Sequence, residues 1–256
     1  MKKIIISFFC VLLCVGAYAK CTVTVTSSLL DCCVEDIGKD RVEIYTLVPV
    51  SACPGHFDLS PNDIKKAKKS DYIFCHGFEP YVQKINVGND YAICKDQNML
   101  VPKHYIEGLR FVCGKLCAKD KKNEAFYRKN LKEATERINK LDRTVRARAK
   151  KLKGRTAVCS VNNKPLLMYF GFNVTASFPV PDKITPKTWT DIVRKSKKTK
   201  IDYCIDNLQS GKNTALQLSR DLKAKHLVTS NFPGGFPNTE TYEKCLLFNL
   251  SICLGE

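Results

Sequence analysis

Apolar and polar positions in the first third of the chain follow two alternating periods. Apolar residues in 29–37 recur at helical spacing and stop before Gly38, whereas 22–26 and 41–47 alternate apolar and polar positions as strands do. A helix over 64–70, preceded by a capping Ser60, and a strand over 71–75 repeat the unit. This alternation of strand and helix predicts a parallel sheet with crossover helices.

The middle of the chain carries one uninterrupted helical pattern. Apolar residues recur in steps of three and four from 119 to 153, with charged residues between them and no proline or glycine until Gly154. These apolar positions are Tyr127, Leu131, Ala134, Ile138, Leu141, Val145 and Leu152. A helix of that extent would be about 50 Å long. Most helices are much shorter, so we expect this one to join two lobes.

After Gly154 the strand and helix periods return, which predicts a second α/β unit. The expected strands are 155–160, 174–178, 200–205 and 226–229, and the expected helices are 165–171, 185–196, 212–223 and 239–253. The predicted fold class is therefore α/β, with two lobes that each hold a mainly parallel sheet and flanking helices. We expect the lobes at 20–118 and 154–256, joined by the long helix at 119–153.

The first 19 residues have the composition of a signal peptide. Two lysines precede an apolar run at 4–16, and Ala17-Tyr18-Ala19 supplies a small-residue cleavage site. The apolar run is shorter than the roughly 20 residues that a membrane-spanning helix needs. We therefore expect a periplasmic or secreted protein. Cys21 leaves open a lipid anchor on the outer face of the membrane, although Lys20 rather than a small residue precedes it.

The chain of 256 residues is strongly basic, with a formal net charge of +17. Such a charge can attract nucleic acid, an anionic cell surface or an acidic partner. The lysines and arginines are mostly scattered, however, and no aromatic residues are interleaved with the basic clusters as a base-stacking surface requires. A solvated basic surface without nucleic acid is the interpretation that we prefer.

Fourteen cysteines are many for this length. In an exported chain they indicate disulfides, and Cys32 with Cys33, or Cys113 with Cys117, are the candidates for bridging. Several others close short apolar runs, as in 72–75 and 91–94, where a thiol packs as a small hydrophobic group. The absence of any Cys-x-x-Cys pair argues against a zinc knuckle or a thioredoxin-type redox site.

Polar loops follow the predicted strands, and four of them, at 48–59, 75–77, 206–211 and 230–235, hold candidate ligands. His56 lies in a proline- and glycine-bounded turn, His76 follows a strand directly, and Asp206 follows another. In open parallel sheets, ligands bind beyond the carboxyl ends of the strands, and imidazole with carboxylate suits zinc, manganese or iron. Each residue also has a structural alternative: His56 or Asp206 can cap the next helix, and His76 can bind loop carbonyls.

At these loops the sequence resembles the periplasmic receptors of zinc and manganese ABC importers, in the class whose lobes a long helix joins. The resemblance runs over nearly the whole chain after residue 19. Its best segments are Asp40-Arg41-Val42-Glu43, Leu47-Val48-Pro49, His56-Phe57-Asp58, Pro61-Asn62-Asp63-Ile64 and Gly77-Phe78-Glu79-Pro80. It implies a binding protein that closes on a divalent metal ion, most often zinc or manganese, and delivers the ion to a membrane permease.

The ligand set departs from the pattern of that family. The family has a histidine directly after the proline of the first loop, whereas here Gly55 comes between Pro54 and His56. Three further ligand positions correspond to the neutral amides Gln97, Asn162 and Asn231. Amides are weak ligands for zinc but good hydrogen-bonding groups. The site could therefore hold a bare ion on His56, His76 and Asp206, or a hydrated or chelated metal.

The sequence bears on three classes of function. The first is a monomeric solute-binding protein that captures a divalent metal ion or metal complex for an ABC permease, with no organic cofactor and no nucleic acid. The second, an enzyme, is disfavoured because the chain lacks a Gly-x-Ser-x-Gly elbow and a His-Glu-x-x-His motif. The third, a basic adhesin or nucleic-acid- or surface-binding protein without metal, is the alternative that the net charge permits.

Overall fold

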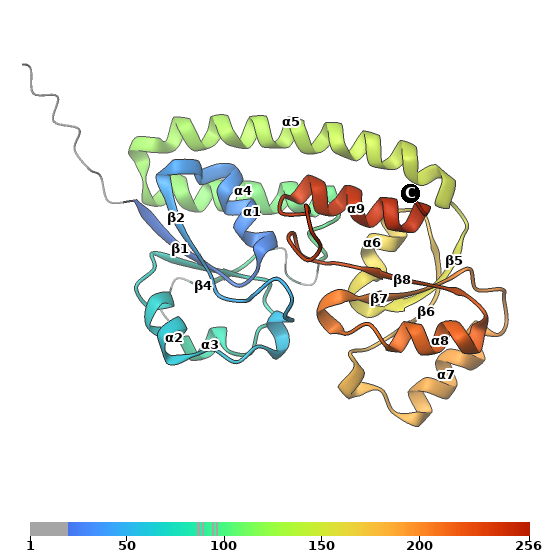
Figure 1. Cartoon of the computed structure of the whole chain (residues 1–256). Coiled ribbons are helices and arrows are strands. Elements are labelled where there is room, and N and C mark those ends of the chain that lie inside the picture. Colours follow the sequence, from blue (N-terminus) through green and yellow to red (C-terminus); the bar gives the residue numbers. More distant parts are fainter. Residues whose placement is uncertain (1–19, 86–87, 89, 94, 96) are drawn as a thin grey trace, which may run out of the picture.

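Two four-stranded parallel sheets lie side by side beneath a long helix (Figure 1). The computed structural model describes residues 20–85, 88, 90–93, 95 and 97–256. The predicted signal peptide at 1–19 and the predicted strand-end Cys94 lie outside these residues. The two sheets, their flanking helices and the long helix confirm the predicted fold class.

The two sheets have the same topology. The first consists of β1 (Cys21–Val25), β2 (Val42–Thr46), β3 (Tyr72–Cys75) and β4 (Asp90–Ala92), in the order β2-β1-β3-β4. The second consists of β5 (Thr156–Ser160), β6 (Asn173–Phe178), β7 (Tyr203–Asn207) and β8 (Lys225–Thr229), in the order β6-β5-β7-β8. In each sheet the first strand along the chain lies between the second and the third, and all pairs are parallel.

The crossover helices begin where the sequence provides caps. The first lobe holds α1 (Ser28–Gly38), α2 (Pro61–Ala67) and α3 (Val82–Ile85), and the second holds α6 (Lys164–Tyr169), α7 (Pro186–Ser196), α8 (Thr214–Leu222) and α9 (Tyr242–Leu254). The hydroxyls of Ser27, Thr185 and Thr241 accept hydrogen bonds from the first turns of α1, α7 and α9. Ser60 and Asp63 form a reciprocal capping box at α2.

One hydrogen-bonded arrangement occurs at the equivalent place in both lobes. Asp71 Oδ2 accepts hydrogen bonds from Thr22 N at 2.9 Å and Thr22 Oγ1 at 3.1 Å, just before β3. Asp202 Oδ2 accepts from Thr156 N at 2.9 Å and Thr156 Oγ1 at 3.1 Å, just before β7. Each aspartate therefore ties the start of the third strand of its lobe to the first strand, and the two lobes are structural repeats.

The predicted long helix is present as α5 (Glu124–Ala149), a helix of 26 residues extended by the 3-10 turns 121–123 and 150–152. A second long helix, α4 (Pro102–Lys119), was not predicted and lies beside α5 (Figure 1). The sequence did not predict α4 because it contains Gly108, and glycine is unfavourable in a helix. A Cβ at Gly108 would lie 2.6 Å from Met99 Cε, so the glycine allows α4 to approach the loop beside it.

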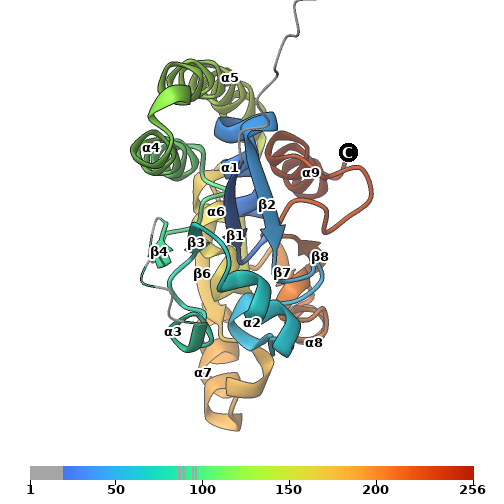
Figure 2. The ribbon, with the colours of Figure 1, turned by 90° about the vertical axis from the view of Figure 1, so that its left-hand side faces the viewer.

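One hydrophobic core runs through both lobes. Its members include Val23 and Phe74 of the first sheet, Ile138 of α5, Cys159 of the second sheet and Leu246 of α9. Figure 2 shows α4, α5 and α9 on one side of the sheets and α2, α3, α7 and α8 on the other. A separate apolar cluster lies under the second group of helices in each lobe. The shared core fixes how the two sheets face one another.

The eleven cysteines within the described part of the chain are thiols, and no disulfide joins them. Cys113 and Cys117, one turn apart on α4, have their sulfur atoms 3.8 Å apart, and Cys32 and Cys33 are not bridged either. The prediction of disulfides at these two pairs is therefore wrong for this structure, and the alternative of thiols packed in the core holds for most of them. Within the described ranges, no helix combines the length and the apolar character that crossing a bilayer requires.

Candidate functional site at the lobe seam

The carboxyl ends of strands from the two lobes meet at a polar junction, which we call the lobe seam. Hydrogen bonds across the lobes there join Val50 and Asn98 of the first lobe to Asn162, Gln209 and Asn231 of the second, and Ser28 of the first lobe to Pro233 of the second. Gln209 Nε2 donates a hydrogen bond to Val50 O at 2.9 Å, and Asn98 Nδ2 donates to Asn162 O at 3.0 Å. The loops after β2, β5, β7 and β8 therefore converge at the seam, as the parallel sheets predict.

His56 lies at the seam with half of its side chain exposed. It ends the short 3-10 turn Pro54–His56, in which His56 N donates a hydrogen bond to Cys53 O. Its Nε2 is 3.9 Å from Asp182 Oδ2 of the second lobe, and their side chains are 49% and 63% exposed. This separation is too long for a hydrogen bond. The imidazole nitrogen is therefore within reach of solvent and of a carboxylate on the opposite lobe.

His76 is buried at the end of β3, and its ring already has contacts on three sides. Nε2 is 2.8 Å from Ser27 Oγ; the ring stacks on Phe78 at a centroid distance of 5.5 Å and lies tilted against Phe232 at 5.7 Å. Burial lowers the pKa of His76, which favours the neutral imidazole. A neutral imidazole can bind metal, but here Nε2 bonds to the Ser27 hydroxyl, the cap of α1.

Asp206 is buried within the second lobe, and both carboxylate oxygens are occupied. Oδ1 accepts a hydrogen bond from Ala215 N in the first turn of α8 at 2.9 Å, and Oδ2 is 2.9 Å from His226 Nε2. Burial raises the pKa of Asp206, although the bonds from Ala215 and His226 act against it. Asp206 therefore makes the bond to the next helix that is the structural alternative to a ligand role.

The three amides predicted at ligand positions, Gln97, Asn162 and Asn231, have different surroundings. Gln97 is exposed. Asn162 and Asn231 both lie at the seam: Asn231 Nδ2 donates to Asn162 O at 3.2 Å, and Asn162 Nδ2 donates to Ser210 Oγ at 3.0 Å. Asn98, which the sequence did not single out, donates to both Asn162 and Asn231. Neutral hydrogen bonds thus fill much of the junction.

Two further ligand-type side chains near the seam were missed. Asp182 lies in the turn Pro181–Lys183 after β6, and Cys53 precedes the turn that carries His56. The rule that selected His56 and Asp206, a ligand-type residue in the loop after a strand, also applies to Asp182. Nothing in the sequence alone shows that the loops at 53–56 and 181–183 meet, because they belong to different lobes.

The described ligand-type side chains at the seam do not form a complete metal site in this structure. Within the ranges that the structure describes, no three side chains of His, Cys, Asp or Glu are placed so that they could hold a metal ion together. His56, His76 and Asp206 therefore form no ready three-ligand set. The joint metal-binding role of these residues stays a prediction, and of the three only His56 has an exposed side chain.

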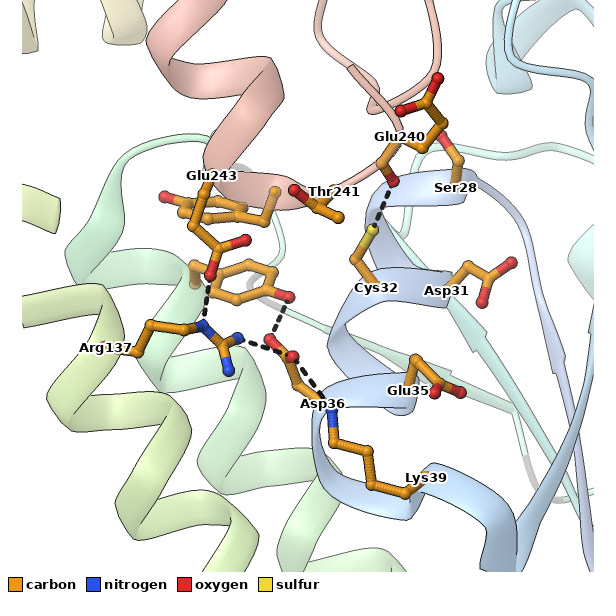
Figure 3. Close-up of a pocket in the computed structure, with 12 residues that line it drawn as sticks. Ser28, Asp31, Cys32, Glu35, Asp36, Lys39, Arg137, Glu240, Thr241 and Glu243 are labelled. Carbon is orange, nitrogen blue, oxygen red and sulfur yellow. Dashed lines mark hydrogen bonds and ion pairs between the residues drawn. The ribbon is translucent and has the colours of Figure 1, made fainter. Parts of the chain in front are cut away.

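A pocket of about 600 Å³ lies elsewhere, between α1, α5 and the start of α9 (Figure 3). Its carboxylates are largely paired: Asp36 with Arg137 and Tyr105, and Glu243 with Arg137. Among the described residues, none of the six predicted site positions lines it. The pocket is therefore an ion-paired junction between helices of the two lobes, separate from the strand ends.

The sequence of this chain matches one family model and several known relatives. The family model described as zinc-uptake complex component A, periplasmic, matches residues 23–95 and 99–252. The chain is 26% identical over 226 residues to the metal ABC transporter substrate-binding lipoprotein FimA of Streptococcus parasanguinis, which covers 73% of this chain and 72% of that protein.

Solved structures share the fold. The manganese-bound periplasmic metal-binding protein of Candidatus Liberibacter asiaticus aligns with a TM-score of 0.79 at 20% identity, over 92% of this chain and 99% of that one. The nickel complex of the solute-binding protein FpvC from P. aeruginosa aligns with a TM-score of 0.79 at 18% identity, over 93% and 96% of the two chains. With the family match over most of the sequence, the chain belongs to the periplasmic zinc-uptake component A family.

Proposed function

We propose that this protein is an extracytoplasmic solute-binding receptor that captures a divalent metal ion, or a small metal complex, at the lobe seam. It hands this cargo to an ABC permease in the membrane. The observation that carries the proposal is the place of His56: an exposed imidazole at the seam, facing the second lobe, in a chain of a family named for zinc uptake. Imidazole nitrogen is a common ligand of zinc and of other divalent transition metals.

The fold supports a binding role through the position of the strand ends. Because all strands in both sheets are parallel, their carboxyl ends present loops to one shared junction. A ligand held there contacts both lobes at once, and its presence favours the arrangement in which the two lobes are together. A permease can then distinguish the loaded protein from the empty protein by the relative position of the two lobes.

The six predicted site residues take different parts in this proposal. His56 is the first ligand, since within the described part of the chain no hydrogen bond to its imidazole has to be broken for binding. His76 and Asp206 could join only by releasing Ser27 and His226. Gln97, Asn162 and Asn231 offer neutral groups, which suit the water molecules or chelating groups around a metal better than the metal itself.

The ion is zinc or manganese in this proposal, as in the relatives named for metal or manganese transport. Neither the relatives nor the fold neighbours lend support to the alternative of a basic adhesin or nucleic-acid-binding protein. The relatives are named as substrate-binding proteins, and we propose that this chain likewise binds its ligand without catalysis. We also propose that it acts as a monomer.

The test is the metal content of the protein as purified from its export compartment without chelators, measured by mass spectrometry. We expect close to one equivalent of a divalent transition metal in the parent protein and a strong loss in His56→Ala. Lys183→Ala, an exposed change in the turn opposite, serves as the control and should keep the metal. Equal metal content in His56→Ala and the parent would remove His56 from the site.

A further inference from the structure

The strands of the second sheet begin at the end of that lobe that lies away from the seam. Three segments meet there, and they are 150–155 before β5, 197–202 before β7 and 221–225 before β8. Hydrogen bonds join them, since Thr156 Oγ1 donates to Lys200 O at 2.6 Å and Lys225 N donates to Asp202 O at 2.9 Å. We call this surface the basic end of the second lobe.

The basic end carries a concentrated positive charge. Its three segments hold nine exposed lysine and arginine side chains, which are Lys150, Lys151, Lys153, Arg155, Lys197, Lys198, Lys200, Lys223 and Lys225. They hold two carboxylates, Asp202 and Asp221, and a third, Glu256, follows α9. Arg155 is 3.7 Å from Asp202, and Lys151 is 3.7 Å from Glu256. Nine cations therefore face three carboxylates, and the excess charge is exposed to solvent.

A groove that contains the indole ring of Trp189 opens beside the basic end. The groove has a volume of about 520 Å³, and its lining includes Trp189, Val193, Lys197 and Asp221. It lies between α7 and α8, which run side by side at the lower right of Figure 1. Trp189 is the single tryptophan of the chain and is partly exposed. Because Lys197 and Asp221 belong to both features, the indole and the lysines form one continuous surface.

We propose that the basic end and the groove between α7 and α8 dock this protein on the surface of an anionic phospholipid bilayer. Lysine and arginine side chains near such a surface are attracted to the anionic headgroups, and salt limits the reach of this attraction to about 10 Å. Tryptophan is enriched at the level of the headgroups, where the ring meets apolar chains and its N–H meets water. A cluster of lysines beside one partly exposed indole fits this surface.

A bilayer fits this surface better than a nucleic acid does. Nucleic-acid grooves stack successive bases on several aromatic side chains, whereas Trp189 is the one aromatic residue among the described residues that line the groove. Docking through the starts of the strands also leaves the seam, at their carboxyl ends, open to its cargo. The inference therefore goes beyond the proposed function and does not depend on which ligand the seam holds.

The test is binding of the purified protein to lipid vesicles, with the fluorescence of Trp189 as the readout. We expect vesicles that contain phosphatidylglycerol to bind the protein and to shift the emission to shorter wavelength, whereas vesicles of pure phosphatidylcholine do neither. Each lysine near an anionic bilayer strengthens binding roughly fivefold. A variant that changes one lysine in each segment should therefore bind about 100-fold more weakly. Its substitutions are Lys153→Gln, Lys198→Gln and Lys225→Gln.

A matched control variant loses the same charge from exposed lysines of α2 and α5. Its substitutions are Lys65→Gln, Lys132→Gln and Lys140→Gln. The control should bind the anionic vesicles nearly as tightly as the parent does. Salt at about 0.5 M should release the parent, because it shortens the range of the attraction. Both variants should bind zinc as the parent does, since neither changes the seam.

Three results would overturn the docking surface and leave the receptor function standing. The first is equal weakening of vesicle binding in the two variants, because net charge alone would then explain the attraction. The second is vesicle binding by the parent with no change in the emission of Trp189. The third is binding of the parent to DNA but not to phosphatidylglycerol vesicles, which would assign the lysines to a nucleic acid.

Discussion

At the scale of single residues, one aspartate in each lobe stabilises the fold through its charge. These residues are Asp71, just before β3, and Asp202, just before β7. Burial raises the pKa of Asp71, but the hydrogen bonds from Lys119 and Thr22 outweigh it and leave the pKa below its ordinary value. In the second lobe, the hydrogen bonds from Thr156 lower the pKa of Asp202 against a smaller effect of burial. Both carboxylates therefore stabilise the fold in their charged form.

Asp71→Ala tests this account. A hydrogen bond to a charged group contributes about 1.5–3 kcal/mol, and Asp71 receives three, but solvent screens this partly exposed cluster, so we expect the free energy of unfolding at pH 7 to fall by about 2 kcal/mol or more. A depressed pKa gives stability that is present above the ordinary value near 3.9 and is lost as the pH falls through the folded-state pKa. The difference between variant and parent should therefore shrink below about pH 4.

Chemical denaturation at several pH values measures this effect. Asp40→Ala provides the control, because Asp40 is exposed and paired only loosely with Arg41. The control should change the free energy of unfolding by less than about 0.5 kcal/mol. A difference between Asp71→Ala and the parent that stays constant from pH 7 to pH 3 would contradict a charge-dependent role for this carboxylate.

The sequence could locate the candidate residues but not their partners. His56, His76 and Asp206 follow predicted strands, and the structure places each in a loop or at a strand end as expected. The bond of His76 to Ser27 joins residues 49 positions apart, and that of Asp206 to His226 joins residues 20 apart. Only the fold brings these pairs together, so spacing alone could not show that two predicted ligands are already engaged.

At the scale of elements, the long helix was predictable because its apolar stripe is regular. Tyr127, Ala134, Ile138 and Val145 are all buried against the shared core, as their spacing indicates. Asn130 lies on the same buried face and donates a hydrogen bond to Ile37 O at 2.9 Å, which satisfies a carbonyl of the last turn of α1. The helix α4 escaped prediction because glycines and polar residues interrupt its pattern.

Ile138→Ala measures how far α5 couples the lobes. Ile138 is fully buried in the core cluster that includes residues of both sheets. Deleting a buried isoleucine side chain costs about 2–5 kcal/mol. We expect thermal unfolding to remain a single transition at a lower midpoint, whereas the exposed change Lys140→Ala should leave the midpoint within about a degree. Two separate transitions in Ile138→Ala would show that the lobes unfold independently.

At the scale of the whole molecule, the periodicity of the sequence predicts both lobes, and the structure adds how they face one another. The repeated strand order follows from two rounds of strand and helix alternation. The approach of His56 to Asp182 does not, because it depends on the shared core that fixes how the two sheets face one another. The net charge of +17 marks a basic surface and takes no part in the proposed site.

The central claim is that one divalent metal ion binds at the seam between the lobes. Calorimetric titration of the folded, metal-free protein with zinc tests it most directly. We predict saturable binding of one ion per chain, lost or much weakened in His56→Ala while the unfolding transition of that variant stays as in the parent. Absence of saturable binding by the folded parent, or identical binding by His56→Ala, would contradict the account.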